Sequence, residues 1–504
     1  MILRSIGAGG LALPFLHTGA RAERVPGTIV FGLSTYPPNT QPWANTGTAS
    51  VTVKLQMYRG LLSYNADGTL RGELAESWKS DGGTGWTFTL RDAVFHNGKK
   101  VTSADVKWTL EQVADPKSTA YLRNAIRQIV KVETPDDKTV RLITKEPNAV
   151  LPETLANPHM PIIAAGSTDD HGEPVGAGPY VTTANERGVS IEMAAFDKFY
   201  RPGLPKTKKL RFVAYADENL RVAALQAGDV DIIEYVPWQS MDAIDADPKL
   251  SMQTVDGPFM ALSFNGGQGP FKDKLIRQAV AYAIKREDIV KAAFYGRGNV
   301  LEGIPIAHSS PFFDKARSEH WKYDPAKAKA LLAQAGQPNG FACTLLSTAQ
   351  YGMHKSTAEV VQQSLAGIGV QVTLKLPDWA TRVSLGNRGQ YEFVVQGTTA
   401  DNNDPDGLAS VLDSSLPANN ARSVNLPVPK IHELFAKGRE EFDQGKRKAI
   451  YAELEERALD MCPLVGLAWR AQGYAMAKNL VGFRNLPAAM TFFSGLTLEE
   501  THFA

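Results

Sequence analysis

Hydrophobic and polar positions form their clearest pattern in residues 73–113. Apolar and polar side chains alternate along residues 86–90 (WTFTL), which is the period of a strand with one buried face. An Asn-Gly pair at 97–98 supplies the residues that a tight turn prefers. Thr102 precedes Asp105 by three residues, a capping-box start for a helix whose apolar positions recur every three or four residues. This stretch therefore predicts a strand, a turn, a short strand and a capped helix.

The rest of the chain alternates between short apolar strands and amphipathic helices. The strand–helix–strand order of residues 341–376 is that of a βαβ unit, so the fold class is α/β. A length of 504 residues exceeds what one core supports, and the lack of a Pro/Ser-rich linker favours lobes that share strands. Strands are predicted at 29–34, 128–134, 139–144, 208–215, 229–233, 260–265, 341–347, 370–376, 391–396 and 464–469. Helices are predicted at 54–62, 219–227, 274–283, 285–294, 325–335, 354–365 and 446–459.

Charge and the N-terminal residues narrow the class of protein. Lys and Arg number 54 against 53 Asp and Glu, and without a basic stripe this balance excludes a typical nucleic-acid binder. Residues 1–22 predict an export signal, because Arg4 flanks a short apolar run and Ala20-Arg21-Ala22 is an A-x-A cleavage site. The alternative is an N-terminus without a targeting role. Since this leader lacks the cysteine that a lipid anchor needs, we expect a periplasmic protein.

Motifs of covalent chemistry are missing from the sequence. No G-x-S-x-G elbow, P-loop or H-E-x-x-H motif occurs, so we expect no enzyme, no cofactor and no metal site. Cys343 and Cys462 form either one disulfide or two separate buried thiols. Five residues match positions of a calcium-binding EF-hand loop, with a solvated turn as the alternative. They are Asn402, Asp404, Asp406, Gly407 and Asp413.

Five segments resemble, in order, the solute-binding proteins of the peptide/nickel/opine class, which is family 5 of the ABC-importer substrate-binding proteins. This resemblance implies a periplasmic-binding-protein type II-like fold of two lobes with an additional domain, the group called cluster C. It also implies a solute enclosed between the lobes, an ABC permease as the partner in the inner membrane, and a monomer. The five segments are residues 73–113, 176–181 (GAGPYV), 221–232 (RVAALQAGDVDI), 277–290 (RQAVAYAIKREDIV) and 323–336 (YDPAKAKALLAQAG).

The resemblance also divides the chain. After the signal peptide at 1–22, we expect an extra domain at 56–174 and lobe II at 263–474. Lobe I is then assembled from residues 23–55, 175–262 and 475–504.

The loop at residues 397–407 (GTTADNNDPDG) is the strongest candidate for a ligand contact. Asp401 follows the end of a strand, where a carboxylate can project into a cleft. The resemblance aligns Asp401 with an aspartate that pairs with the α-ammonium of the ligand in dipeptide binders. The alternative is an Asx turn that caps its own loop. Thr398 stands where the related run has a tryptophan, which replaces an aromatic wall with a hydroxyl.

The other candidate contacts also come from the resemblance. Dipeptide binders hold the ligand carboxylate with an arginine on the loop at 347–351, and this chain has none there, which argues against a strict dipeptide binder. Residues 46–48 align with a Ser-Gly-Thr run that lines the ligand, although they could instead cap the next helix. The remaining candidates could equally be ordinary packed side chains. The candidates are Thr46, Gly47, Thr48, Tyr121, His159, Trp379 and Trp238.

Three functions can be weighed on these residues. The first is the binding of a peptide or an opine-like, amine-containing solute for an ABC importer. The alternative is a receptor for a nickel chelate or another metallophore on the same fold. An exported hydrolase is disfavoured because no nucleophile motif is present.

Overall fold

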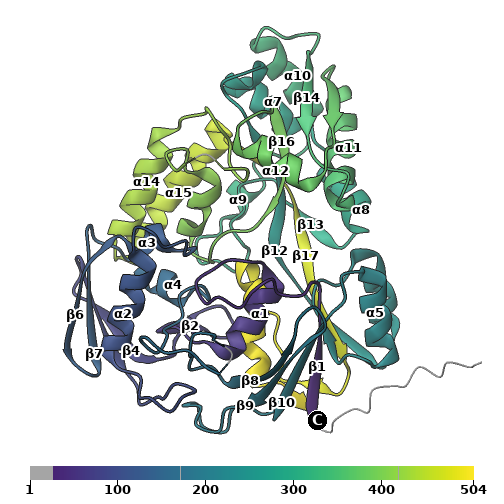
Figure 1. Ribbon diagram of the computed structural model, residues 1–504. Coiled ribbons are helices and arrows are strands. Elements are labelled where there is room, and N and C mark those ends of the chain that lie inside the picture. Colours follow the sequence, from purple (N-terminus) through teal and green to yellow (C-terminus); the bar gives the residue numbers. More distant parts are fainter. Residues whose placement is uncertain (1–26, 171, 418) are drawn as a thin grey trace, which may run out of the picture.

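The computed structural model describes residues 27–170, 172–417 and 419–504 (Figure 1). The predicted α/β class is confirmed, while the expected export signal at 1–22 lies outside the described residues. Among the described residues, one large sheet contains eleven strands. Its order is β15 (Gln371–Lys375), β14 (Ala342–Leu346), β16 (Phe393–Thr398), β12 (Leu250–Phe264), β17 (Leu464–Ala477), β11 (Ile232–Ile233), β1 (Thr28–Leu33), β10 (Lys209–Ala214), β9 (Ser190–Ala195) and β8 (Tyr180–Glu186), and β13 (Gly298–Val300) pairs with β17.

Two long strands join the upper and lower parts of the molecule. β12 has 15 residues and β17 has 14, and Figure 1 shows both running from the lower into the upper part. They pair antiparallel, with register shifts between Asp256 and Phe259 and between Met260 and Ala261. Such bulges bend a strand pair locally. The expected domain boundaries at 262 and 474 fall inside these two strands.

The lower part surrounds the β8–β11 side of the sheet. The GAGPYV turn packs there against the end of the first helix, α1, where Gly178 N donates to Met57 O at 3.0 Å. A Cβ atom at Gly178 would lie 2.2 Å from Gln56 O, so the close approach requires glycine. The elements here are α1 (Thr48–Met57), α5 (Glu218–Ala227), η1 (Trp238–Ser240), α6 (Met241–Ala246), β18 (Leu480–Val481), η4 (Ala488–Glu499) and β19 (His502–Phe503).

Residues 56–174 contain a four-stranded sheet (β4-β5-β7-β6), a separate two-stranded sheet (β2-β3) and three short helices. The alternating residues 86–90 are indeed a strand, and the predicted capping box is confirmed because Asp105 accepts the Thr102 backbone N–H at 3.1 Å. The predicted short strand before this helix is only an isolated bridge between Val94 and Lys100. The elements are β2 (Leu62–Tyr64), β3 (Leu70–Gly72), β4 (Ala75–Ser80), β5 (Gly85–Leu90), α2 (Ser103–Ala114), α3 (Arg123–Ile126), β6 (Ile129–Asp136), β7 (Thr139–Thr144) and α4 (Leu151–Ala156).

The upper part contains the predicted βαβ unit, formed by β14, β15 and the helix between them. Cys343 and Cys462 are buried and free in this part, so they are two thiols and not a disulfide. No helix within 27–170, 172–417 or 419–504 combines the length and apolar composition of a bilayer crossing. The helices are η2 (Pro270–Lys272), α7 (Lys274–Ala283), α8 (Arg286–Phe294), α9 (Lys315–Ser318), α10 (Pro325–Gln334), α11 (Gly352–Ala366), α12 (Trp379–Asn387), η3 (Pro405–Leu408), α13 (Ala409–Leu412), α14 (Pro429–Glu440) and α15 (Gln444–Met461).

Four sequence predictions differ from the structure in extent. The helix expected at 54–62 is α1, which begins at Thr48 and ends at Met57, and β2 follows. The strand expected at 229–233 is reduced to the two residues of β11. The strands expected at 260–265 and 464–469 are only the apolar ends of β12 and β17.

Candidate ligand-binding cleft

The loop after β16 presents Asp401 to solvent. Asn402 accepts the backbone N–H of Asp404 at 3.0 Å, and Asp404 accepts that of Asp406 at 2.9 Å, so these two side chains form the Asx turns of the loop. The Asp401 carboxylate instead lies 3.5 Å from the Tyr121 hydroxyl. Although the residue is exposed, the protein around it raises the pKa of Asp401 through desolvation. This combination describes a carboxylate that reaches solvent while protein surrounds much of it.

Tyr121 connects this carboxylate to the extra domain. Its ring packs edge-on against His159, with 5.0 Å between the ring centroids. His159 is buried and its Nδ1 makes no hydrogen bond to the protein, while burial and the Lys54 ammonium lower the pKa of this histidine to about 3. The imidazole is therefore neutral. The structure thus brings Asp401, Tyr121 and His159 together from two separate parts of the chain.

The segment 46–48 lies at the start of α1 without capping it by a side chain. Gly47 is the residue before the helix, has a φ of 96°, and no side-chain hydrogen bond caps the N-terminus. Thr46 Oγ1 is buried without a hydrogen-bond partner in the protein, and Thr48 Oγ1 lies 3.5 Å from Tyr235 Oη. These hydroxyls retain hydrogen-bonding capacity, and Tyr235 stacks on Phe492 at 5.8 Å.

Trp379 and Trp238 occupy different environments. Trp379, half-buried at the first turn of α12, packs edge-on against His354 at 5.4 Å and against Tyr351 at 5.3 Å. Trp238 packs on Phe294 in the core, and its Nε1 donates to Ala471 O at 2.8 Å. Trp238 is therefore a core residue. Thr398 ends β16, opposite Phe259 in the neighbouring strand, and donates weakly to Thr399 O at 3.4 Å.

Sequence reasoning missed a cationic group near Trp379. Arg470 on β17 and Arg382 on α12 are both buried, and both contribute, after desolvation, to lowering the pKa of the intervening His354 to about 3. Arg470 stands in the otherwise apolar run LVGLAWRAQGYAMA, and a charge at such a position was the available signal. The absence of an arginine at 347–351 therefore does not leave this region without cations.

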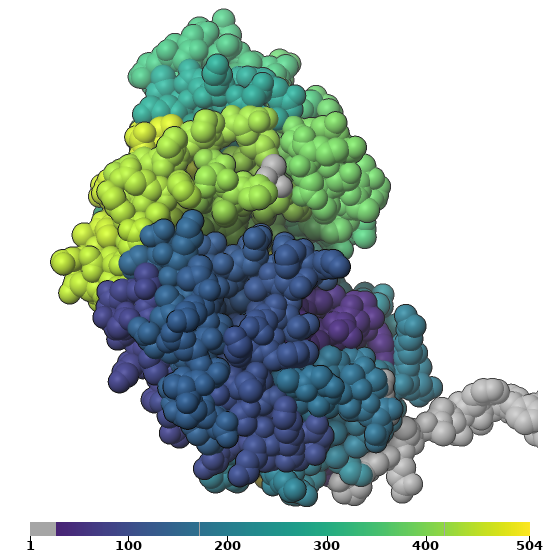
Figure 2. Space-filling model, turned by 60° about the vertical axis from the view of Figure 1, so that its left-hand side comes forward, coloured from purple at the N-terminus to yellow at the C-terminus, as the bar shows by residue number. Residues whose placement is uncertain are grey.

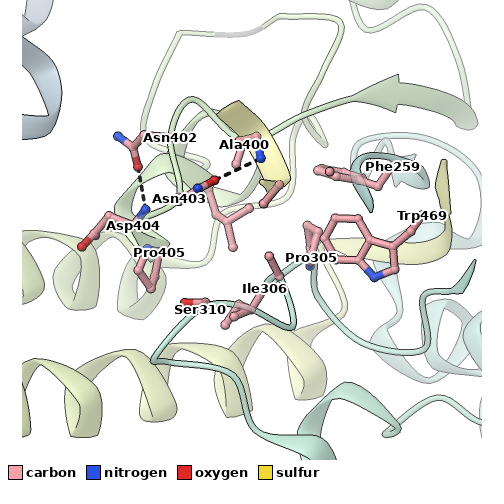
Figure 3. A pocket seen from close by; sticks show the side chains of 15 residues that line it. Phe259, Pro305, Ile306, Ser310, Ala400, Asn402, Asn403, Asp404, Pro405 and Trp469 are labelled. Carbon is pink, nitrogen blue, oxygen red and sulfur yellow. Dashed lines mark hydrogen bonds between the residues drawn. The ribbon is translucent and has the colours of Figure 1, made fainter. Parts of the chain in front are cut away.

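A recess lies beside the two long strands (Figure 3). Phe259, Trp469, Pro305 and Ile306 form its apolar wall, and the loop from Ala400 to Leu408 borders it. Trp469 and Arg470 are neighbours on β17, so their side chains project to opposite faces of the strand. None of the candidate ligand residues lines this recess. Ala400 and Asn402, which flank Asp401 in the chain, do line it, so the recess borders the loop that carries Asp401.

Asp404 and Asp406 of the loop are paired with arginines. Arg447 holds Asp404 through two contacts of 3.0 Å, and Arg439 donates to Asp406 at 2.7 Å. Asp413 accepts from Ser415 Oγ at 2.7 Å and lies 2.9 Å from His432 Nδ1. Among the described residues, no group of three or more His, Cys, Asp or Glu side chains is placed to hold a metal ion.

Glu153 on α4 faces the same acidic loop across an interface with α14 and α15. Figure 2 shows these helices seated against the extra domain, and Ala149 N donates to Arg439 O at 2.6 Å. Glu153 Oε2 is buried without a hydrogen bond. Burial, and then the Asp404 carboxylate, raise the pKa of Glu153 from 4.5 to about 8. The folded protein therefore holds this carboxyl group in its neutral form near pH 7.

We expect Glu153→Gln to remove a pH dependence of stability. Because the folded pKa lies above the unfolded value, ionisation of Glu153 destabilises the fold as the pH rises from about 4.5 to about 8. Glu153→Gln should match the wild type at pH 4.5 and exceed its free energy of unfolding by about 2–4 kcal/mol at pH 8. Urea unfolding at both pH values measures this difference. The exposed Glu146→Gln should change neither value, and equal stabilities of Glu153→Gln and wild type at pH 8 contradict the prediction.

Comparison with known proteins identifies the class. Residues 69–420 match the sequence profile of the bacterial extracellular solute-binding proteins, family 5. Since the match covers more than half of the chain, this protein belongs to that family, and the resemblance seen in the sequence is confirmed.

Its relatives bind different solutes. The periplasmic binding protein AgaA from A. tumefaciens R10, solved in complex with agropinic acid, is 41% identical with a TM-score of 0.83, over 95% of this chain and 99% of AgaA. The glutathione-binding protein GsiB from Pectobacterium atrosepticum is 29% identical over 91% of this chain and 92% of its own. NikA from Brucella suis, in complex with Fe(III)-EDTA, is 22% identical with a TM-score of 0.82, over 95% of this chain and 100% of NikA. These likenesses confirm the type II-like fold with an additional domain.

Proposed function

We propose that this protein is the periplasmic substrate-binding component of an ABC importer and that it binds an amine-bearing, opine-like or peptide-like solute. The observation that carries the proposal is Asp401, an exposed carboxylate that no cation of the described residues neutralises. A primary or secondary ammonium group would pair with it, and the Tyr121 hydroxyl would orient the carboxylate. The identity of 41% with an opine-binding protein supports an opine-like solute.

The proposed movement follows from the division into two lobes. Lobe I (23–55, 175–262 and 475–504) and lobe II (263–474) would close on the solute by bending β12 and β17, at the register shifts between Asp256 and Ala261. Residues of the 46–48 segment belong to lobe I, whereas Asp401, Thr398 and Trp379 belong to lobe II. Closure would therefore enclose the solute between these groups, without covalent chemistry, and present it to the permease.

The first test is the identity of the solute that the purified protein carries. Denaturing the protein and analysing the released small molecules by mass spectrometry should yield an amine-bearing opine-like conjugate or short peptides. Metal analysis of the same sample tests the alternative, since a nickel or iron chelate in place of an amine-bearing solute would favour a metallophore receptor. A solute without an amine would contradict the assigned role of Asp401.

A further inference from the structure

Arg470 is a buried cation to which the described part of the chain supplies no counter-charge. Its side chain is 6% exposed, Nη1 lies 3.3 Å from the sulfur of Met353, and Nε makes no hydrogen bond to the protein. Desolvation lowers the pKa of Arg470, and no carboxylate of the described residues acts on it. Arg277 shows the usual arrangement of a buried arginine here, because it donates to four backbone carbonyl groups. Arg470 is thus unlike a structural arginine.

A second buried cation lies close by. Arg382 is 1% exposed, donates to Val395 O and to Gln396 Oε1 at 2.6 Å each, and leaves its Nε without a partner. Its guanidinium group stacks over the Trp379 ring at 5.1 Å. His354 lies between the two arginines and stays neutral, with Nδ1 unpaired. Two buried guanidinium groups therefore lie near one histidine, and no acidic side chain of the described residues accompanies them. Burying unpaired charges destabilises the folded protein, and a bound anion would offset that cost.

This cationic group lies beside residues that the sequence predicts to contact the ligand. Arg470 lies near Tyr235, because desolvation raises the pKa of this tyrosine and Arg470 partly offsets the rise. The Tyr235 hydroxyl lies 3.5 Å from Thr48 Oγ1, one of the candidate ligand residues. Trp379, another candidate, packs on both His354 and Arg382. Asp401 forms no ion pair with either arginine among the described residues. Asp401 and Arg470 are therefore two separate charged groups, one negative and one positive, and each lies beside candidate ligand residues.

We propose that Arg470, together with Arg382 and His354, forms an anion subsite that binds a carboxylate of the transported solute, with Trp379 as its wall. The planar guanidinium fork suits a planar carboxylate, which can accept two parallel hydrogen bonds. The inference rests on the proposed function in placing this subsite in the same cleft as Asp401. It adds that the solute class is zwitterionic, with an ammonium group at one end and a carboxylate at the other.

The test uses malonate as a simple carboxylate probe and malonamide as its uncharged counterpart. Protein freed of any cargo by unfolding and refolding is heated with each compound at matched ionic strength. Malonate should raise the unfolding midpoint of the wild type by a few degrees, whereas malonamide should not. Arg470→Met should abolish this rise. Because Arg470 donates to no backbone carbonyl group, the variant should fold, and its own midpoint without malonate should lie above that of the wild type.

Two matched variants complete the test. Arg388→Met removes an exposed arginine at the end of α12 and should leave the response to malonate intact. Asp401→Asn should also retain the response, so a failure of the proposed ammonium site is distinguishable from a failure of the anion subsite. The proposal is overturned if malonate does not shift the wild type, or if Arg470→Met responds as the wild type does.

Discussion

Replacing Glu73 with alanine should lower the free energy of unfolding by about 3–5 kcal/mol. Glu73 is completely buried, lies 2.6 Å from Arg71 Nη2, and accepts a hydrogen bond from the Tyr200 hydroxyl. Burial alone would raise the pKa of Glu73, but Arg71 and Arg59 outweigh it, and the pKa falls below its ordinary value. Without this carboxylate, Arg59 would be left buried beside a single acidic partner, Glu499 at 2.8 Å.

Urea unfolding at pH 7 measures this effect. Glu76→Ala, three residues along the chain and exposed on β4, is the matched control and should stay within about 0.5 kcal/mol of the wild type. A loss below about 1 kcal/mol in Glu73→Ala would show that the remaining glutamate neutralises the arginines unaided.

Replacing Asp401 with alanine should weaken binding of the amine-bearing solute by about 2–5 kcal/mol, because the bound ammonium would be enclosed without its counter-charge. Asp401→Asn keeps the shape of the side chain and should lose nearly as much, since the charge is the essential feature. Isothermal titration with the solute identified by mass spectrometry measures both. Asp137→Ala, in the exposed turn between β6 and β7, is the control and should bind as the wild type does.

The affinity for an ammonium-bearing solute should also depend on pH, and the raised pKa of Asp401 gives the direction of this dependence. Only the ionised carboxylate attracts an ammonium group, and the pKa of Asp401 is raised. Affinity should therefore fall as the pH decreases through this raised pKa, which begins at a higher pH than for an ordinary aspartate. In Asp401→Asn the affinity should be flat over the same range. An identical pH profile in the two proteins would remove Asp401 from the site.

Local pattern was enough to predict the small sheet and the capping box, because alternation at 86–90 and the Thr102–Asp105 spacing are properties of neighbouring residues. The local pattern did not predict the parts of β12 and β17 that lie in the lower part of the molecule, residues 250–259 and 470–477. In β17, Arg470, Gln472 and Gly473 interrupt the apolar run, although all of their neighbours are buried by tertiary packing. From the sequence alone, polar residues that are buried inside a strand look the same as polar residues that mark the end of a strand.

For the candidate site, too, some residues could be predicted from the sequence and others could not. The resemblance indicated Asp401, Tyr121 and His159 as separate candidate contacts, and in the structure Tyr121 lies next to both of the others. Their role in binding stays a prediction. The resemblance could not indicate Arg470, since that residue meets His354 and Arg382 only after three separate elements assemble. Residue type and spacing carry no information on such a contact.

The position of β17 has a consequence for how the chain is made. This strand lies between β12 and β11 in the large sheet, yet it is encoded at residues 464–477, far behind β1 at residues 28–33. Until β17 has been synthesised, the edges of β12 and β11 that face it in the finished sheet have no strand to pair with. Completion of the large sheet therefore requires nearly the whole chain, so its folding is coupled to the end of synthesis.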